Sequence, residues 1–207
     1  MCIARCTRCL GITLVPLAVV SMLANTLLLF PDLQIQYLLE GHVTKYAIWV
    51  PGLWASGFLV LLVARAFISS GSKKDCCGFR SEMLCSFMYV AIAVAGASFC
   101  FLMSGTGLAE GPLCKFNVTL SNGNQSQVWG TPLELKNSRD KSYLFDQSRW
   151  EGVCEEPRGV VLWNMVLFSV LMASSGLQAV ICAVQAINAV LGLVCGPGFR
   201  KNKVGPM

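Results

Sequence analysis

The sequence predicts an all-α membrane protein: a four-transmembrane-helix bundle with one large disulfide-closed loop on the extracellular or lumenal side. Three observations predict this fold. Only 13% of the 207 residues are charged and 55% are hydrophobic, whereas about a quarter of the residues of a soluble domain are charged. Four uncharged stretches approach or exceed the roughly 20 apolar residues that a helix needs to cross the hydrocarbon core. Basic residues gather on one side of these stretches, as the positive-inside rule requires.

The four stretches divide the chain into segments that alternate between the two sides of the membrane. The predicted transmembrane helices are residues 10–30, 47–68, 83–109 and 159–185. The expected outside segments are a short loop, residues 31–46, and a large loop, residues 110–158. The expected cytosolic segments are an N-terminal tail, residues 1–9, a loop, residues 69–82, and a helix extension with the C-terminal tail, residues 186–207. A signal peptide is the alternative for the first stretch, but its apolar run exceeds the roughly 7–15 residues typical of one.

The Lys and Arg residues predict that both termini are cytosolic. The short loop on the other side contains Lys45 as its single basic residue. The large loop carries similar numbers of basic and acidic residues, and long loops cross the membrane largely regardless of charge. These basic residues therefore determine topology, and no nucleic-acid partner is expected despite the net charge of +5. The basic residues on the cytosolic side are Arg5, Arg8, Arg65, Lys73, Lys74, Arg80, Arg200, Lys201 and Lys203.

Two sequons and two cysteines independently mark the large loop as translocated. Asn117 and Asn124 each begin an N-glycosylation sequon. Cys114 and Cys154 are the only two of the eleven cysteines in translocated segments, and an oxidising compartment favours their pairing. Their bond would close the base of the loop and stabilise it by about 4 kcal/mol in the chain-entropy picture. The polar stretch from Asn117 to Gln127 has no helical or strand period, so we expect an irregular, glycan-bearing tip.

The search for catalytic or cofactor-binding groups finds none. His42 is the single histidine, lies in the short loop and has no evident partner in the sequence. There is no Ser–His–Asp set, no phosphate-binding glycine loop and no pair of buried acids, so we expect no enzyme activity and no cofactor. The aromatic part of the large loop is instead expected to form a small apolar cap near the membrane, made of Tyr143, Leu144, Phe145 and Trp150 beside Trp129.

The cytosolic cysteines admit three interpretations. Juxtamembrane cysteines near basic residues are typical S-palmitoylation sites. A zinc site is the second interpretation, with thiolates from Cys6, Cys9, Cys76 and Cys77; the adjacent second pair does not fit an ordinary zinc knuckle, so no metal site is predicted. Plain reduced thiols are the third. The palmitoylation candidates are Cys2, Cys6, Cys9, Cys76, Cys77 and Cys195.

Polar residues within the expected spans should face other helices, because amides are costly in lipid. In the last span Asn164, Gln178 and Gln185 lie on one stripe, at multiples of seven residues. The stripe is either a pathway for a solute or a set of interhelical hydrogen bonds. No carboxylate or histidine lies within any span, and amides commonly serve as packing contacts between helices, so the second interpretation is favoured. Asn25 in the first span is expected to act in the same way.

Ordered blocks across nearly the whole chain carry a specific resemblance. They are Met1-Cys2, Arg5-Cys6, Arg8-Cys9, Pro16-Leu17-Ala18, Ala24-Asn25, Gly107 to Cys114, Trp150, Cys154, Glu156-Pro157, Trp163-Asn164, Gln185 and Ile187-Asn188. In these blocks the sequence resembles the transmembrane 4 L-six family, which are tetraspanin-like four-helix membrane proteins.

The resemblance implies a non-enzymatic multi-pass membrane organiser or adaptor. Such a protein would associate laterally with integrins, receptors or tetraspanins and influence adhesion, motility or growth signalling. Its other expected contacts are with the lipid bilayer and, as a further option, with copies of itself in a homo-oligomer. The plasma membrane is the expected location, with an endolysosomal membrane as the alternative. Two alternative functions stay open: a small-solute transporter or sensor that uses the polar stripe of the last helix, or an accessory subunit of a membrane complex.

Overall fold

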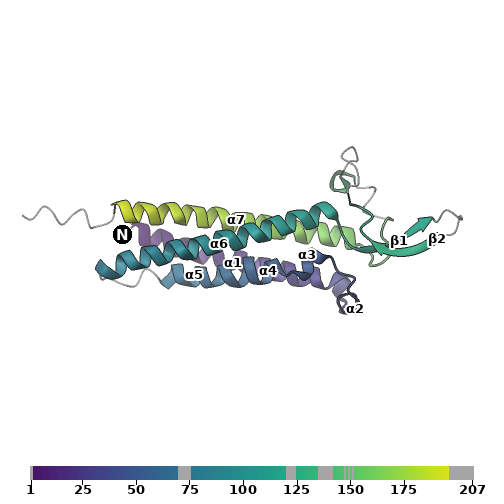
Figure 1. Cartoon of the computed structure of the whole chain (residues 1–207), viewed down its shortest axis with the longest axis horizontal. Helices are drawn as coiled ribbons and strands as arrows, with labels where there is room; N and C mark the ends of the chain where they lie inside the picture. Colours follow the sequence, from purple (N-terminus) through teal and green to yellow (C-terminus); the bar gives the residue numbers. More distant parts are fainter. Residues whose placement is uncertain are drawn as a thin grey trace, which may run out of the picture.

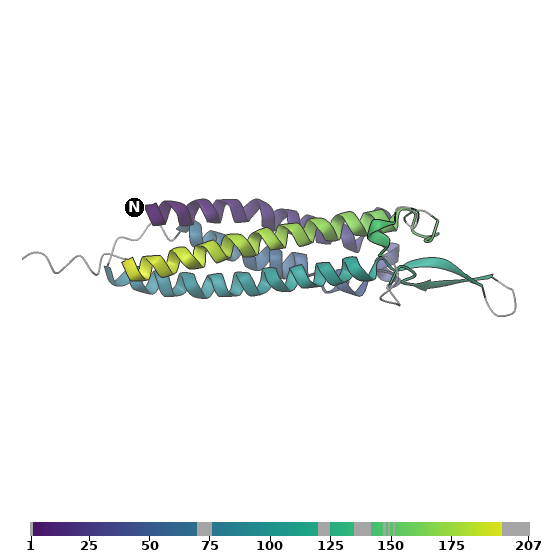
Figure 2. The ribbon, with the colours of Figure 1, turned by 90° about the horizontal axis from the view of Figure 1, so that it is seen from above.

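A computed structural model describes residues 2–69, 76–119, 125–134, 142–146, 148, 150 and 152–195, with side chains described outside 2–6, 76–84, 86, 188 and 191–195. Four long helical segments lie side by side, with the N-terminus at one end of the bundle and a β-hairpin at the other (Figures 1 and 2). Three of the segments are the continuous helices α1 (Cys2–Leu29), α6 (Cys76–Glu110) and α7 (Val160–Cys195).

These four segments are long and apolar enough to cross a membrane. The qualifying stretches are Thr7–Leu29, Lys45–Ser69, Phe87–Glu110 and Val160–Ile187. The predicted bundle of four transmembrane helices is therefore confirmed. The exact membrane boundaries within the helices stay a prediction.

The second segment is built from several pieces instead of one continuous α-helix. Pro51 lacks an N–H and disfavours helical backbone at the residue before it, and Val50 there adopts a left-handed conformation with φ of 51°. The remainder passes through one π-helical stretch, a device often found where a helix must re-aim its side chains. The pieces are α3 (Lys45–Ile48), α4 (Pro51–Leu53), the π-helix η2 (Trp54–Phe58) and α5 (Leu59–Ser69).

Small residues form much of the helix interfaces, and larger apolar side chains cover the outside. Ala18, Ala64 and Ala93 are fully buried, whereas Leu102 and Val180 are more than 60% exposed. Lipid solvates large apolar side chains as well as a protein core does, so close backbone packing is what holds such helices together. Helix α7 packs mainly on α6 and α1, and α5 packs mainly on α1.

Two paired strands in the large loop correct the expectation of no strand structure for residues 117–119 and 125–127, whereas the tip, residues 120–124, lies outside the described residues. Strand β1 (Cys114–Thr119) pairs antiparallel with β2 (Gln125–Gly130), in the register Cys114 opposite Gly130. Strand β1 alternates apolar and polar residues, with Cys114, Phe116 and Val118 apolar, so a period-two strand pattern was present there and the expectation overlooked it. A short 3-10 turn, η4 (Tyr143–Phe145), follows in the large loop, and the short loop contains η1 (Pro31–Leu33) and α2 (Gln36–Leu39).

Candidate functional site

A disulfide closes the base of the large loop, as predicted. Cys114 at the start of β1 is bonded to Cys154, with 5.6 Å between their Cα atoms. Next to this bond the chain that returns to α7 joins the hairpin: the Lys115 N–H donates to the Glu156 carbonyl at 3.0 Å, and the Glu155 N–H donates to the Lys115 carbonyl at 2.9 Å. Covalent and hydrogen bonds thus tie the hairpin to the end of the loop.

The carboxylate of Glu155 braces both strands. It accepts from the side-chain amide of Asn117 on β1 at 2.5 Å and from that of Gln127 on β2 at 2.6 Å. The first of these donors is the nitrogen to which a glycan would be attached in the Asn117 sequon, on an exposed strand. Asn124 lies outside the described residues. Glycosylation at both sites stays a prediction.

Tyr143 is the centre of a small core beneath the hairpin. Its hydroxyl donates to the Leu108 carbonyl at the end of α6 at 2.6 Å, and its own carbonyl accepts from the Trp150 indole at 2.8 Å. Burial raises the pKa of Tyr143 to about 12. Leu144 and Trp150 pack on the same cluster, as expected for the apolar cap, but Phe145 is 89% exposed and does not belong to it.

The short loop is docked onto the hairpin by an aromatic stack. The His42 imidazole lies on the Trp129 indole with ring centroids 3.8 Å apart and an interplanar angle of 4°. The His42 Nδ1 atom is also 3.2 Å from the Glu40 carboxylate. The expectation that His42 has no partner was therefore wrong, and Trp129 contacts the short loop instead of the cap. These two residues are far apart in the sequence, so no local spacing indicated the contact.

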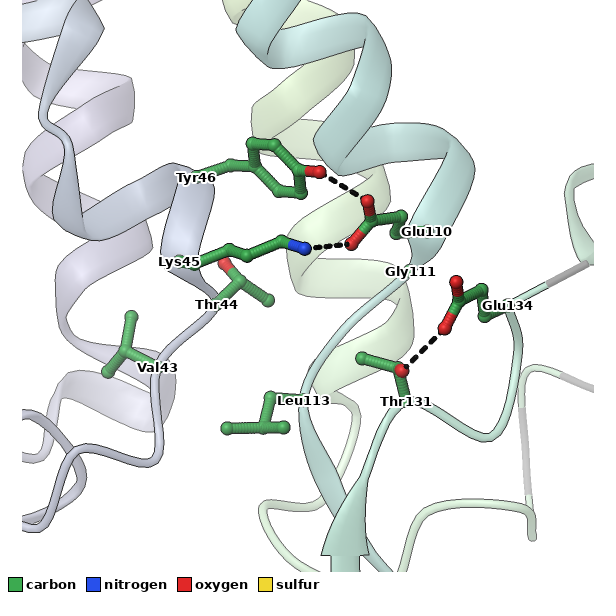
Figure 3. A pocket seen from close by; sticks show the side chains of 9 residues that line it. All are labelled: Val43, Thr44, Lys45, Tyr46, Glu110, Gly111, Leu113, Thr131 and Glu134. Atoms are coloured by element: carbon green, nitrogen blue, oxygen red, sulfur yellow. Dashed lines mark hydrogen bonds and ion pairs between the residues drawn. The ribbon is translucent and has the colours of Figure 1, made fainter.

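A cavity of about 270 Å³ lies between the start of α3, the end of α6 and the chain that follows β2 (Figure 3). The Glu110 carboxylate accepts from the Tyr46 hydroxyl and is 3.2 Å from the Lys45 ammonium. The sequence analysis did not single out this cluster. The residues that line the cavity are Val43, Thr44, Lys45, Tyr46, Glu110, Gly111, Leu113, Thr131 and Glu134.

Within the bundle, three helical segments meet at one buried polar cluster. The Gln178 carbonyl oxygen on α7 accepts from the Ser56 hydroxyl at 2.7 Å, and its amide nitrogen donates to the Ser56 carbonyl at 3.0 Å. Ser21 on α1 is 2.9 Å from the Ser56 hydroxyl and 2.8 Å from that of Ser174. The π-helix η2 contributes Ser56. The stripe on the last span predicted a role for Gln178, but no sequence pattern indicated Ser21 or Ser56, because a serine within a span is common and carries little signal.

The other intramembrane amides have different partners. Asn25 on α1 accepts from the Gly52 N–H at 2.6 Å and donates to the Ala47 carbonyl at 3.4 Å. The Gln185 amide nitrogen donates to the Thr7 hydroxyl at 3.1 Å, so these two residues join α1 to other segments. Asn164 is buried but donates to the Val160 carbonyl of its own helix at 3.1 Å.

The cysteines that the sequence predicts to be cytosolic lie mostly beyond what the structure describes. The side chains of Cys2, Cys6, Cys76, Cys77 and Cys195 fall outside the described residues, although their helical backbones are within them. Cys9 is exposed on α1. Palmitoylation stays a prediction. Among the described residues no group of three or more His, Cys, Asp or Glu side chains could hold a metal ion.

The chain is similar in sequence to known membrane proteins of one family. Residues 1–198 match the family described as "L6 membrane protein". Transmembrane 4 L6 family member 19 of Mus musculus is 37% identical and covers 94% of this chain and 93% of its own. Member 1 of Homo sapiens is 37% identical (95% of each chain), and member 4 of Mus musculus is 38% identical (95% of this chain and 93% of its own).

The segments Tyr37-Leu38-Leu39, Cys114-Lys115-Phe116 and Tyr143-Leu144 suggest member 19, which is among the relatives found, at the same 37–38% identity as members 1 and 4. No solved structure matches the chain. The helices, the disulfide-closed loop and these relatives agree, and the chain belongs to the L6 membrane protein family of tetraspanin-like, multi-pass membrane proteins.

Proposed function

We propose that the protein is a non-enzymatic membrane organiser that associates laterally with other membrane proteins, such as integrins, receptors or tetraspanins, through its joined outer loops. The observation that carries this proposal is the docking of the two loops into one surface. The Cys114–Cys154 bond closes the large loop, and the His42–Trp129 stack fixes the short loop to it. A preorganised surface loses less conformational freedom on binding than two separate loops would.

Exposed apolar side chains on this surface suit a protein partner. Phe145 in the large loop is 89% exposed and Leu39 in the short loop, on α2, is 82% exposed. Figure 1 shows α2 and the hairpin of the large loop at the end of the bundle opposite the N-terminus. Val128 on β2 adds a third, at 46% exposure. Aromatic and aliphatic side chains at the centre of a contact contribute most of the binding energy in protein interfaces. Through such contacts with partner proteins, the protein would influence adhesion, motility or growth signalling at the plasma membrane.

The experiment compares co-purifying partners of wild type and Cys114→Ser/Cys154→Ser, captured in mild detergent and identified by mass spectrometry. We expect the double variant to lose most partners while protease mapping still gives four spans, because insertion depends on helix hydrophobicity. Cys85→Ser is the matched control: it removes an exposed free cysteine outside the loop. A partner list that is the same in all three proteins would move recognition to the helices or the cytosolic tails.

The two alternatives have less support. A solute pathway along α7 needs polar groups that are open to a solute, yet the Gln178 amide is already hydrogen-bonded to Ser56 through both of its atoms. An accessory subunit would bind a single partner at fixed stoichiometry. The same capture experiment separates this case from that of an organiser, which would bring several partners in variable amounts.

A further inference from the structure

The cavity of Figure 3 lies at the end of two of the helical stretches that are apolar enough to cross a membrane. Lys45 begins and Glu110 ends two of the apolar stretches that can cross the membrane. Both residues line the cavity, so it is placed where the hydrocarbon core gives way to the polar layer of the bilayer. Its volume of about 270 Å³ is just below the roughly 300–1,000 Å³ of pockets for drug-sized ligands. It can therefore hold a head group but not a whole lipid.

The cavity has the Lys45–Glu110 ion pair on one wall and the Glu134 carboxylate on the other. Lys45, on the α3 side, is 68% exposed and uses its ammonium group on Glu110, which leaves further N–H donors for a ligand. Glu134, on the opposite wall, accepts from the Thr131 hydroxyl at 3.2 Å through one carboxylate oxygen. Within the described residues its second oxygen has no protein partner. The remaining Lys45 donors thus suit an anionic group, although Glu110 is beside them, and the Glu134 wall suits a cationic hydrogen-bond donor.

Thr44 supplies a second, independent sign of a missing partner. It lines the cavity, is only 8% exposed, and its hydroxyl oxygen is buried without a hydrogen-bond partner. The residue is at the N-cap position of α3, where a threonine hydroxyl usually accepts from the first turn, but it makes no such bond. A ligand in the cavity would supply the missing partner if the side chain turns to another staggered position.

We propose that this cavity binds a phosphoethanolamine group, and that its source is the head group of a membrane lipid. The primary ammonium has three N–H donors, which match the Glu134 carboxylate and the Thr131 and Thr44 hydroxyls, whereas the phosphate accepts from Lys45. A choline head group has no N–H to donate and fits this arrangement less well. Soluble phosphoethanolamine carries the same ammonium and phosphate groups, so the test below separates it from the lipid. The proposal is independent of the partner-binding role.

The test uses the full chain purified in mild detergent and incubated with phosphatidylethanolamine or with phosphatidylcholine of the same acyl chains. Native mass spectrometry counts the lipid that each protein retains. We expect wild type to retain the ethanolamine lipid about tenfold more than the choline lipid, the effect of one charge-assisted hydrogen bond. Glu134→Gln and Thr44→Val should abolish this preference. Glu40→Gln, which removes a carboxylate outside the cavity, should keep it.

Two further measurements separate a binding defect from a folding defect and a lipid from a soluble ligand. Thr44→Val should leave the melting temperature of the lipid-free protein unchanged or raised, because it removes a buried hydroxyl that has no partner. If soluble phosphoethanolamine raises the melting temperature of wild type but not of Glu134→Gln, while the two lipids are retained equally, the ligand chemistry stands and the lipid source is overturned. If the two lipids are retained equally and phosphoethanolamine does not raise the melting temperature of wild type, the whole proposal is overturned. It is also overturned if Glu134→Gln and Thr44→Val both still retain the ethanolamine lipid in preference to the choline lipid.

Discussion

Gln178 shows how a single buried side chain joins helices in the bundle. Its amide meets Ser56 through both polar atoms, and Ser56 is presented by the π-helical stretch of the second segment. Interhelical hydrogen bonds in membranes average only about 0.6 kcal/mol, with larger values near 2. We expect Gln178→Leu and Ser56→Ala to destabilise the bundle each by about 1 kcal/mol, with the double variant no worse than the more severe single one. Unfolding in a detergent titration measures this, and strictly additive effects would contradict the contact.

Tyr143 gives the large loop a dependence on alkaline pH. Burial raises its pKa to about 12, from about 10 for an unfolded tyrosine. Its contribution to stability is therefore complete below pH about 10 and is lost as the pH rises from about 10 to 12, because ionisation is easier in the unfolded loop. Tyr143→Phe should remove this dependence, at a cost of about 1 kcal/mol for the bond to Leu108. Near-ultraviolet circular dichroism across this range is the measurement, and a wild-type loop that stays folded without change to pH 12 would refute it.

The sequons at Asn117 and Asn124 predict two glycans on the large loop. Glycosidase treatment should increase the gel mobility of the wild type, and Asn117→Gln/Asn124→Gln should abolish this shift because both acceptor nitrogens are removed. Asn137→Gln is the matched control, since that asparagine is in the same loop without a sequon. A shift that persists in the double variant would place the modification elsewhere.

At the scale of elements, glycines decide how closely the helices approach. A Cβ on Gly96 of α6 would come within 2.8 Å of the Ala55 carbonyl oxygen, a backbone atom that cannot rotate away. On the same helix, a Cβ on Gly105 would meet only a methionine sulfur at 3.8 Å. We expect Gly96→Ala to destabilise the bundle by about 1–3 kcal/mol through overpacking. Gly105→Ala should instead be neutral or stabilising, because alanine is the better helix former. Thermal unfolding of both variants in one detergent tests this, and equal effects would contradict the close contact between α6 and η2.

The elements also show where local sequence patterns are informative. Hydropathy located all four helices because each residue contributes independently to the transfer of a helix into lipid. The hairpin was missed although β1 alternates apolar and polar residues, because the alternation is only six residues long and β2 does not repeat it. The contacts of Glu155 with both strands come from beyond the second strand, and no local pattern indicates them. The break at Val50 was missed as well, although Pro51 marked the place.

At the scale of the whole molecule, both termini are predicted to lie in the cytosol. Nine basic residues on that side oppose a single lysine in the short outer loop. Epitope tags at either terminus should require permeabilisation of the cell for antibody access, whereas a tag inserted after Asn122 in the large loop should be labelled on intact cells. Surface labelling of a terminal tag would overturn this topology. Labelling of the loop tag only after permeabilisation of the plasma membrane would favour an endolysosomal location.

The sequence by itself determined the four spans, the pairing of Cys114 with Cys154 and the membership of the family. Each of these depends on composition, on compartment or on ordered blocks of residues, which can be read along the chain. Only the tertiary structure decided that His42 stacks on Trp129, that Gln178 bonds Ser56, and that Glu110 and Glu134 line one cavity. The physical reason is that such contacts join side chains far apart in the sequence, and they form only where helix packing and loop closure bring those side chains within hydrogen-bonding or van der Waals distance.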